Sequence, residues 1–478
     1  MKTIINYLLL LLPLAAGCVK DNGNYHYAEP PAIEILGIAT DTLFRVQQFD
    51  TLVLAPTLVA TGKAGLEHEW KINNKIVSTD PTLRVEIHEA PNADNSTYIA
   101  SLRVTDKATG LRYYKNFRVA VTTPFTSGLF ILSERADSTA ALSFQGRNKP
   151  AAPLMHDLFE SVNPAFGSLG KKPRQVFHEG SPAQLGVICG EGQYPFTLLN
   201  PATLTLLQRH SKESIRGEHD GAFTPAYGAI YMGGMIAGGG KLYSYNFMNN
   251  KSLYHPVPGE RVFADWIDTN GQLDSYAWVS YDNKAQEFVL LEPGNDMLLY
   301  DKMTPIAVQG NLSTTGQRFL AGGHLGATDL TALRAILHNA AERKAYLYGL
   351  KIVDNFDLTT WVMTITTTLD RFSEISDIVD ANTVCLYDAE YWYLANGNTV
   401  RRLHEKGTAP LDWFTAPRGN VTAMIADKFT PRRLFIATHD GTKSYIYAIN
   451  LATKEMLETP LEMEGKIVSM LAKGKWEY

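Results

Sequence analysis

The chain has 478 residues, of which 45% are hydrophobic and 19% are charged, and it contains 37 glycines and 23 prolines. It is too apolar for a disordered chain and lacks the long apolar runs of a protein with many membrane spans. Lysine and arginine number 44 against 49 acidic residues, a formal net charge of −5. Because no basic excess is available to neutralise phosphates, the composition argues against nucleic acid as a partner.

The N-terminus predicts export. Residues 1–17 begin with a cationic start and continue as an apolar stretch that would be about 20 Å long as a helix, shorter than the ~30 Å hydrocarbon core of a bilayer. We therefore expect a signal peptide rather than a membrane span. The stretch ends in Leu14-Ala15-Ala16-Gly17-Cys18, which resembles the lipobox of bacterial lipoproteins. The resemblance implies that Cys18 is lipidated and begins the mature chain; an ordinary signal with a chance cysteine is the alternative.

A polar segment punctuated by glycine and proline follows, and residues 18–32 are expected to form a lipidated tether. Its Lys20-Asp21 pair resembles the signal that sends lipoproteins of Gram-negative glycan- and peptide-uptake systems to the cell surface. The expected location is therefore the outer membrane, with a lipid anchor and the protein facing the cell exterior.

Short strands with period-two alternation fill residues 33–122, as in an antiparallel Ig-like β-sandwich. The expected strands are Ile33–Ile35, Thr51–Leu54, Leu66–Ile72, Leu83–Ile87, Tyr98–Thr105 and Tyr114–Val121.

Three segments of this region, Glu69–Asn73, Tyr98–Asp106 and Phe117–Val121, resemble the PKD-like family of surface modules. The resemblance implies that Trp70 packs the core from one sheet and that the Tyr98–Asp106 strand faces it.

Residues 125–478 carry a repeat. Segments that begin at Ile375, Val421 and Ile467 match in pattern at an offset of 46 residues. Repeats of this length made of short strands are typical of β-propeller blades. A helical solenoid is the competing repeat fold, and the period-two runs of β-branched and aromatic residues count against it. The predicted fold class is thus all-β: a PKD-like, Ig-like sandwich followed by a β-propeller.

The ends of the array suggest how it closes. Leu129–Ser133 matches Leu434–Thr438, the second strand of the last complete blade, so we expect it to pair with the strand at Ile467. Pairing the first and last strands would leave the ring without a free sheet edge. The expected second strands predict seven blades, with six and eight as alternatives, and start near Leu129, Leu185, Ala229, Tyr276, Leu333, Trp392 and Leu434.

The standard signatures of hydrolase, kinase and metal sites are missing, so we predict no catalytic residue, no metal and no cofactor. Paired carboxylates drawn from distant loops would give no such signal. Cys189 and Cys385 are expected to be small buried residues, with a disulfide between them as the alternative. His178-Glu179 and Glu218-His219-Asp220 are weak metal-ligand candidates.

Two aromatic–acid pairs are the candidate binding residues. Asp265-Trp266 and Asp412-Trp413 lie in turn-like surroundings, where the ring could stack on a sugar or peptide and the carboxylate could bind it. The alternative for each tryptophan is ordinary packing between blades. We place the functional surface at one mouth of the propeller, because the loops converge there on a rigid frame.

Three functions fit these observations. The first is a surface lipoprotein that binds a glycan or peptide without catalysis. The PKD-like region, the lipobox and the Lys-Asp pair together resemble accessory lipoproteins of a TonB-dependent transporter and its lid lipoprotein. The second is a propeller enzyme: a polysaccharide lyase, glycosidase or peptidase. The third is a structural or adhesive surface protein.

The lipobox gives the first testable prediction. Replacing Cys18 with Ala removes the thiol that would carry the lipid, so the variant should leave the membrane fraction for the soluble fraction. Fractionation of cells followed by immunoblotting measures this. Membrane retention equal to that of the wild-type protein would contradict the prediction.

Overall fold

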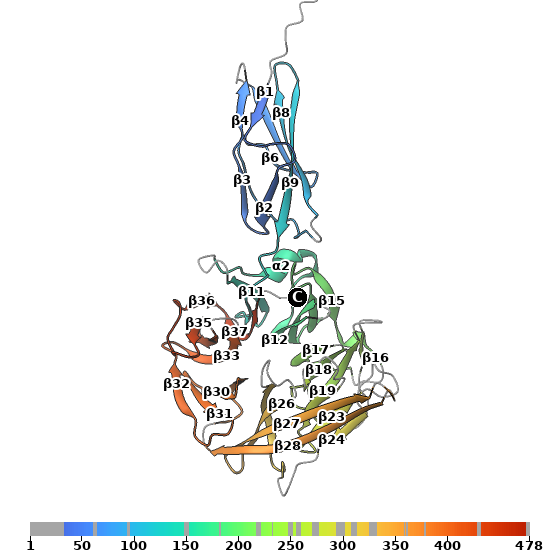
Figure 1. Cartoon of the computed structure of the whole chain (residues 1–478), viewed down its shortest axis with the longest axis vertical. Helices are drawn as coiled ribbons and strands as arrows, with labels where there is room; N and C mark the ends of the chain where they lie inside the picture. The colour runs from blue at the N-terminus through green and yellow to red at the C-terminus, as the bar shows by residue number, and fades with distance from the viewer. Residues whose placement is uncertain are drawn as a thin grey trace, which may run out of the picture. The chain divides into compact units, whose positions relative to one another are not determined.

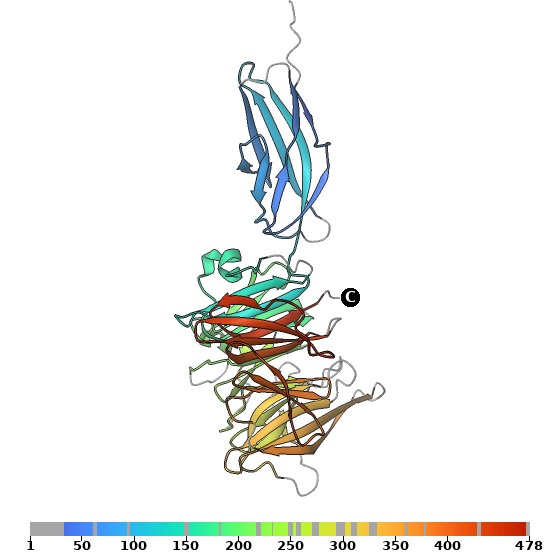
Figure 2. The same ribbon diagram turned by 90° about the vertical axis from the view of Figure 1, so that its left-hand side faces the viewer.

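The computed structural model divides the chain into two compact units, Met1–Thr122 and Thr123–Tyr478. Figures 1 and 2 show both units in two views. The structure describes residues 33–60, 65–92, 96–147, 153–180, 183–216, 221–231, 233–246, 252–254, 260–269, 277–292, 302–306, 313–324, 332–357, 359, 362–376, 379–427 and 432–474. Cys18 and the tether lie outside these residues.

The first unit is a β-sandwich. Its described strands form a five-stranded sheet in the order β2-β9-β8-β5-β6 and two small sheets, β1-β4 and β3-β7. Figure 1 shows β3 and β4 on one side of the unit and β8 and β9 on the other. The strands are β1 (Ile33–Leu36), β2 (Leu43–Gln47), β3 (Thr51–Leu54), β4 (Thr57–Ala60), β5 (Leu66–Ile72), β6 (Lys75–Ser78), β7 (Leu83–Glu86), β8 (Tyr98–Asp106) and β9 (Arg112–Thr122).

Trp70 anchors the core of the sandwich. Its side chain is fully buried, packs edge-on against Phe117 and donates a hydrogen bond from Nε1 to the Asp80 carbonyl at 2.8 Å. One expectation is wrong. The β8 strand does not face Trp70 from the opposite sheet, because β5 and β8 are neighbours with Trp70 opposite Leu102 in register. Both side chains therefore point to the same side of one sheet.

The second unit is a series of sheets that follow one another along the chain. Within the described residues the sheets are β37-β10-β11, β12 to β15, β16 to β20, β21 to β24, β25 to β28, β29 to β32 and β33 to β36. The strands of the first four sheets are β10 (Gly128–Glu134), β11 (Ala140–Gly146), β12 (Lys171–Gly180), β13 (Ala183–Glu191), β14 (Phe196–Leu199), β15 (Leu206–His210), β16 (Ile215–Arg216), β17 (Tyr227–Tyr231), β18 (Gly233–Gly238), β19 (Lys241–Asn246), β20 (Ser252–Tyr254), β21 (Asp268–Thr269), β22 (Trp278–Asp282), β23 (Glu287–Glu292) and β24 (Lys302–Pro305).

The remaining strands are β25 (Arg318–His324), β26 (Ala332–Asn339), β27 (Lys344–Asp357), β28 (Val362–Ser376), β29 (Val384–Asp388), β30 (Tyr391–Asn396), β31 (Thr399–His404), β32 (Leu411–Thr415), β33 (Asn420–Asp427), β34 (Arg433–His439), β35 (Lys443–Asn450), β36 (Leu461–Glu464) and β37 (Lys466–Lys473). A short helix, α2 (Leu158–Val162), and two 3-10 turns, Pro164–Phe166 and Lys212–Ser214, complete the described elements.

The sheets are arranged as a β-propeller. The inner strands contact one another in sequence: β12 contacts β37 and β17, and β29 contacts β25 and β33. In Figure 1 the colours run round a common centre from green β12 through yellow and orange to red β37, and Figure 2 shows the same ring turned by 90°. Strands such as β10 and β34 are buried along almost their whole length because sheets cover both of their faces.

The ring closes between β10 and β37. These strands pair in antiparallel register, with Leu129 opposite Ala472 and Ile131 opposite Met470. This closing sheet contains three described strands, and β11 is its outermost strand. The predicted repeat is correct for Val421 and Ile467, which lie in the inner strands β33 and β37.

Two details of the predicted repeat are wrong. Ile375 lies near the end of β28, the outermost strand of its sheet, rather than in an inner strand. Ala229 lies in β17, the innermost strand of its sheet, where a second strand was expected. Both errors arise because the loops between strands differ in length, so equivalent strands of successive blades are not separated by a constant number of residues. Tyr276 lies outside the described residues.

Gly128 in β10 provides a test of the closing sheet. A Cβ atom at this position would lie 2.3 Å from the Gln145 carbonyl oxygen and 2.4 Å from the Phe144 ring. Overpacking of this kind costs about 1–3 kcal/mol. We expect Gly128→Ala to lower the free energy of unfolding by about 2 kcal/mol, measured by denaturant titration.

Gly146 is the matched control, because it pairs directly with Gly128 and an added Cβ would meet the Phe144 ring only at 3.8 Å. Gly146→Ala should therefore change the unfolding midpoint far less. Equal effects of the two variants would show that close packing at Gly128 is not what stabilises the closing sheet.

Candidate functional site

The structure does not bring the two predicted aromatic–acid pairs together. Asp265 and Trp266 precede β21, whereas Asp412 and Trp413 lie in β32, the outermost strand of a different sheet. Each pair therefore has to be considered in its own surroundings.

Trp413 packs inside its sheet region. Its side chain is 6% exposed and lies edge-on to Tyr393, with ring centroids 5.3 Å apart. Asp412 is exposed and forms an ion pair with Arg401 at 3.0 Å. The ring and the carboxylate therefore have different environments, and the packing alternative describes Trp413.

Trp266 packs between two neighbouring sheets. Its side chain is 3% exposed and stacks on Phe319 of β25, with ring centroids 4.6 Å apart and an interplanar angle of 21°. Gly322 makes room for the indole, because a Cβ there would lie 2.4 Å from the ring. Trp266 is thus the support behind Phe319, and its own faces are not open to a ligand in this structure.

Asp265, by contrast, lines a cavity of about 330 Å³ between the same two sheets. This volume lies at the lower end of the range for small-molecule sites. Three polar residues, Asp265, Asn283 and Arg318, line the cavity together with the partly exposed aromatic residue Phe319. The full lining is Phe263, Ala264, Asp265, Asn283, Arg318, Phe319 and Leu320.

A turn between β22 and β23 fixes the geometry of this cavity. Asp282 caps the turn, and its Oδ1 accepts hydrogen bonds from the backbone N–H groups of Lys284 at 2.8 Å and Ala285 at 3.1 Å. The next residue, Asn283, accepts a hydrogen bond from the Phe319 N–H at 3.1 Å. Because this bond joins the turn of one sheet to the inner strand of the next, it holds Phe319 beside Asp265.

The carboxylate of Asp265 has an unusual environment for an exposed residue. Partial burial raises its pKa, while the guanidinium of Arg174 in β12 and a backbone hydrogen bond at Gly239 oppose that effect. Charged and hydrogen-bonding groups from three sheets therefore meet around this one carboxylate. Such a group can accept hydrogen bonds from ligand hydroxyls.

Larger cavities lie elsewhere, between the β33–β36 sheet and the closing sheet. One has a volume of about 590 Å³ and is lined by residues that include Leu129, Arg147, Arg433 and Phe435. Another, of about 860 Å³, is lined by residues that include Arg135 and Asp157.

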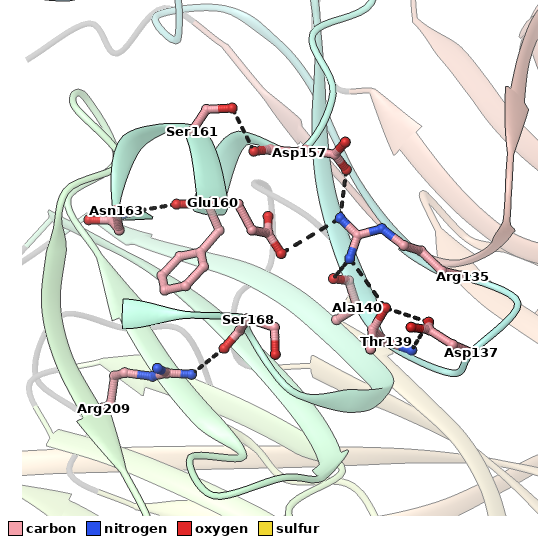
Figure 3. A network of polar contacts seen from close by, with 11 residues as sticks. Arg135, Asp137, Thr139, Ala140, Asp157, Glu160, Ser161, Asn163, Ser168 and Arg209 are labelled. Atoms are coloured by element: carbon pink, nitrogen blue, oxygen red, sulfur yellow. Dashed lines mark hydrogen bonds and ion pairs between the residues drawn. The ribbon is translucent and has the colours of Figure 1, made fainter. Parts of the chain in front are cut away.

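Two charged residues of the larger of these two cavities, Arg135 and Asp157, are paired with each other, as Figure 3 shows. Arg135 forms ion pairs with Asp157 at 2.6 Å and Glu160 at 3.6 Å, and donates a hydrogen bond to the Ala140 carbonyl at 3.0 Å. This network ties α2 to the turn after β10. The Asp265 cavity differs in that Arg318 has no ion-pair partner in the part of the chain that the structure describes.

The structure also bears on the predicted metal and cysteine positions. The described residues contain no group of three or more His, Cys, Asp or Glu side chains placed to hold a metal ion. His178 has its pKa lowered to about 4, chiefly by burial and also by nearby Lys473. Residues 218–220 lie outside the described residues. Cys189 and Cys385 are free thiols, and burial raises the pKa of Cys189 to about 12.

Sequence reasoning missed Asn283, Arg318 and Phe319. No motif could have revealed them, because the three residues come from two sheets and meet only in the folded ring. The one local signal was Asp265 beside Trp266.

A model of the PKD-like family matches residues 18–173. The match covers the sandwich and continues through β10, β11 and α2 into β12. No curated protein matches the chain. None of the described helices has the length and apolar character needed to cross a membrane.

Three solved structures illustrate the fold. The chain is similar to a quinonprotein alcohol dehydrogenase-like protein from Bacteroides thetaiotaomicron, with 13% identity, a TM-score of 0.53, and 94% of this chain and all of that one covered. A candidate 6-phosphogluconolactonase from Bacteroides uniformis has 10% identity and a TM-score of 0.49, with 72% of this chain and 99% of that one covered. An auxiliary nutrient binding protein from Bacteroides thetaiotaomicron has 10% identity and a TM-score of 0.32, with 82% and 92% covered. At these identities the first likeness shows the fold and not an activity.

Buried His210, at the end of β15, predicts how stability depends on pH. Its ring stacks on Phe196 at 5.2 Å, and burial lowers its pKa from the ordinary 6.5 to about 4. As the pH falls below 6.5, the unfolded chain binds a proton that the folded protein excludes, so stability falls until about pH 4. The full effect is about 3 kcal/mol.

We therefore expect His210→Phe to lose less stability than the wild-type protein between pH 7 and pH 4.5, as measured by thermal unfolding. An identical pH dependence in the two proteins would contradict the assignment.

Proposed function

We propose that this protein is a surface-exposed, lipid-anchored binding protein of the outer membrane, and that its propeller binds a glycan in the Asp265 cavity. The N-terminal sequence supports the anchor and the export. On this proposal the sandwich serves as a stalk, and the partners are a TonB-dependent transporter and its lid lipoprotein, with the glycan as the captured nutrient.

The observation that carries the proposal is a cavity lined by the partly exposed aromatic residue Phe319 and three polar residues. Sugars present apolar C–H faces together with hydroxyl groups, so they suit a site with an aromatic surface and precisely oriented donors and acceptors. Asp265 accepts hydrogen bonds, Arg318 donates them, and the amide of Asn283 can do both. The stacked Trp266 keeps the Phe319 ring in place.

Binding fits this lining better than hydrolysis does. Glycosidases commonly use two carboxyl groups about 5–10 Å apart, one on each side of the bond that breaks. Among the described residues, Asp265 is the one carboxylate that lines the cavity. This composition favours recognition of the sugar over its cleavage.

Calorimetric titration with a panel of glycans tests the proposal, with product formation followed in the same samples. Phe319→Ala removes the apolar surface and Asp265→Asn removes the charged acceptor, so each should weaken binding about tenfold or more. Neither change should release product from any glycan.

Asp412→Asn is the matched control, because Asp412 is an exposed aspartate in another sheet whose ion pair with Arg401 lies on the surface. It should bind as the wild-type protein does. Glycan turnover that disappears in Asp265→Asn would show an enzyme instead, and the absence of binding to every glycan in the panel would reject the site.

A further inference from the structure

The lining of the Asp265 cavity contains one acidic and one basic residue, Asp265 and Arg318, and a second arginine acts on Asp265 from outside the lining. Arg318 is the first residue of β25 and lines the cavity. Arg174 in β12 acts on the Asp265 carboxylate and opposes the rise in its pKa that burial causes. Both arginines are exposed. Arg318 thus belongs to the cavity lining, whereas Arg174 acts on the Asp265 carboxylate from outside that lining.

Several other arginines of the same unit form ion pairs. Arg261 forms ion pairs with Asp282 and Glu287 at 3.1 and 3.0 Å, and Arg334 forms one with Glu405 at 2.6 Å. Neither Arg174 nor Arg318 forms such an ion pair within the described ranges of the chain. The positive charge of Arg318 in the cavity lining is thus available to an anionic group of a ligand.

The two arginines lie differently relative to the cavity. Arg318 lines the cavity together with Asn283 and Phe319, so it lies where a ligand bound there can reach it. Arg174 comes from a different sheet and acts on Asp265. Arg318 is therefore the group placed to bind an anion, and Arg174 is a positioning residue that favours the charged form of Asp265.

We propose that the cavity selects an acidic sugar, one whose ring carries a carboxylate, and that Arg318 binds this carboxylate while Asp265 accepts hydrogen bonds from the hydroxyls. The inference rests on the proposed glycan binding and adds the class of sugar. A planar guanidinium matches a carboxylate with two parallel hydrogen bonds, and such charged pairs are stronger than neutral ones. Asp265 would repel an acid placed directly beside it, which directs the sugar carboxylate toward Arg318.

The test compares two probes of one shape and different charge: galacturonic acid trisaccharide and its methyl ester. The wild-type protein should bind the acid at least about tenfold more tightly than the ester, as expected for a charged hydrogen-bonded pair. This preference should shrink as salt is added, because both partners are near the surface.

Arg318→Gln should bind both probes alike, at about the affinity of the wild-type protein for the ester. Arg401→Gln is the matched control, since it removes the same charge from another sheet and should keep the preference. Thermal unfolding of each variant checks that the fold is intact.

The outcomes separate the two proposals. Equal binding of acid and ester by the wild-type protein, with loss of both in Phe319→Ala, would overturn the acidic-sugar inference and leave the glycan site standing. A preference that persists in Arg318→Gln would also overturn the inference. Binding of neither probe would count against the inference, and the wider glycan panel then decides whether the site itself stands.

Discussion

The pairing of β37 with β10 is the contact on which the second unit depends, because it joins the two ends of a ring. β37 also contacts the sheets on either side of it. Its Ser469 Oγ accepts a hydrogen bond from the Val176 N–H at 3.1 Å, and its Lys473 Nζ donates one to the Pro201 carbonyl at 2.7 Å. Burial lowers the pKa of Lys473 to about 8, so this contact combines a desolvated ammonium group with a backbone acceptor. Both of these bonds reach the β12–β15 sheet, and on the other side the Ile467 N–H of β37 donates a hydrogen bond to Ser444 Oγ of β35 at 3.1 Å. One strand therefore binds the closing sheet, the sheet before it and the sheet after it.

The fold could be predicted from the sequence where burial leaves a continuous apolar pattern. Leu129–Ser133 and Leu434–Thr438 are apolar runs because sheets cover both of their faces, and this is why their likeness pointed to equivalent places in the ring. Half-exposed strands such as β1 and β3 could be predicted from their regular alternation, whereas strands without it gave no signal. β2 (Leu43–Gln47) and β6 (Lys75–Ser78) lie at the edges of their sheet and alternate weakly, so they were missed.

The candidate site could be predicted only in part, for a different reason. Asp265 was identified because it stands beside a tryptophan, yet Trp266 is buried and the partly exposed aromatic residue of the cavity is Phe319. The role of Trp266 depends on Gly322, since only a residue without a side chain leaves room for the indole in the adjoining strand. The contact between Trp266 and Gly322 joins two sheets, so it could not be predicted from the spacing or the composition of the chain. The same holds for Arg174, which reaches Asp265 from a third sheet.

The closure of the ring has a consequence for how the protein is made. A ribosome releases β10 long before β37. Because β10 pairs with β37, this pairing cannot form until the far end of the unit has been synthesised. Until then the edge of β10 that faces away from β11 is unpaired, and an unpaired edge can associate with other chains. Sheets such as β12 to β15 pair locally and can form earlier. The pairing of β10 with β37 is therefore the last contact between neighbouring strands of the ring that becomes possible during synthesis.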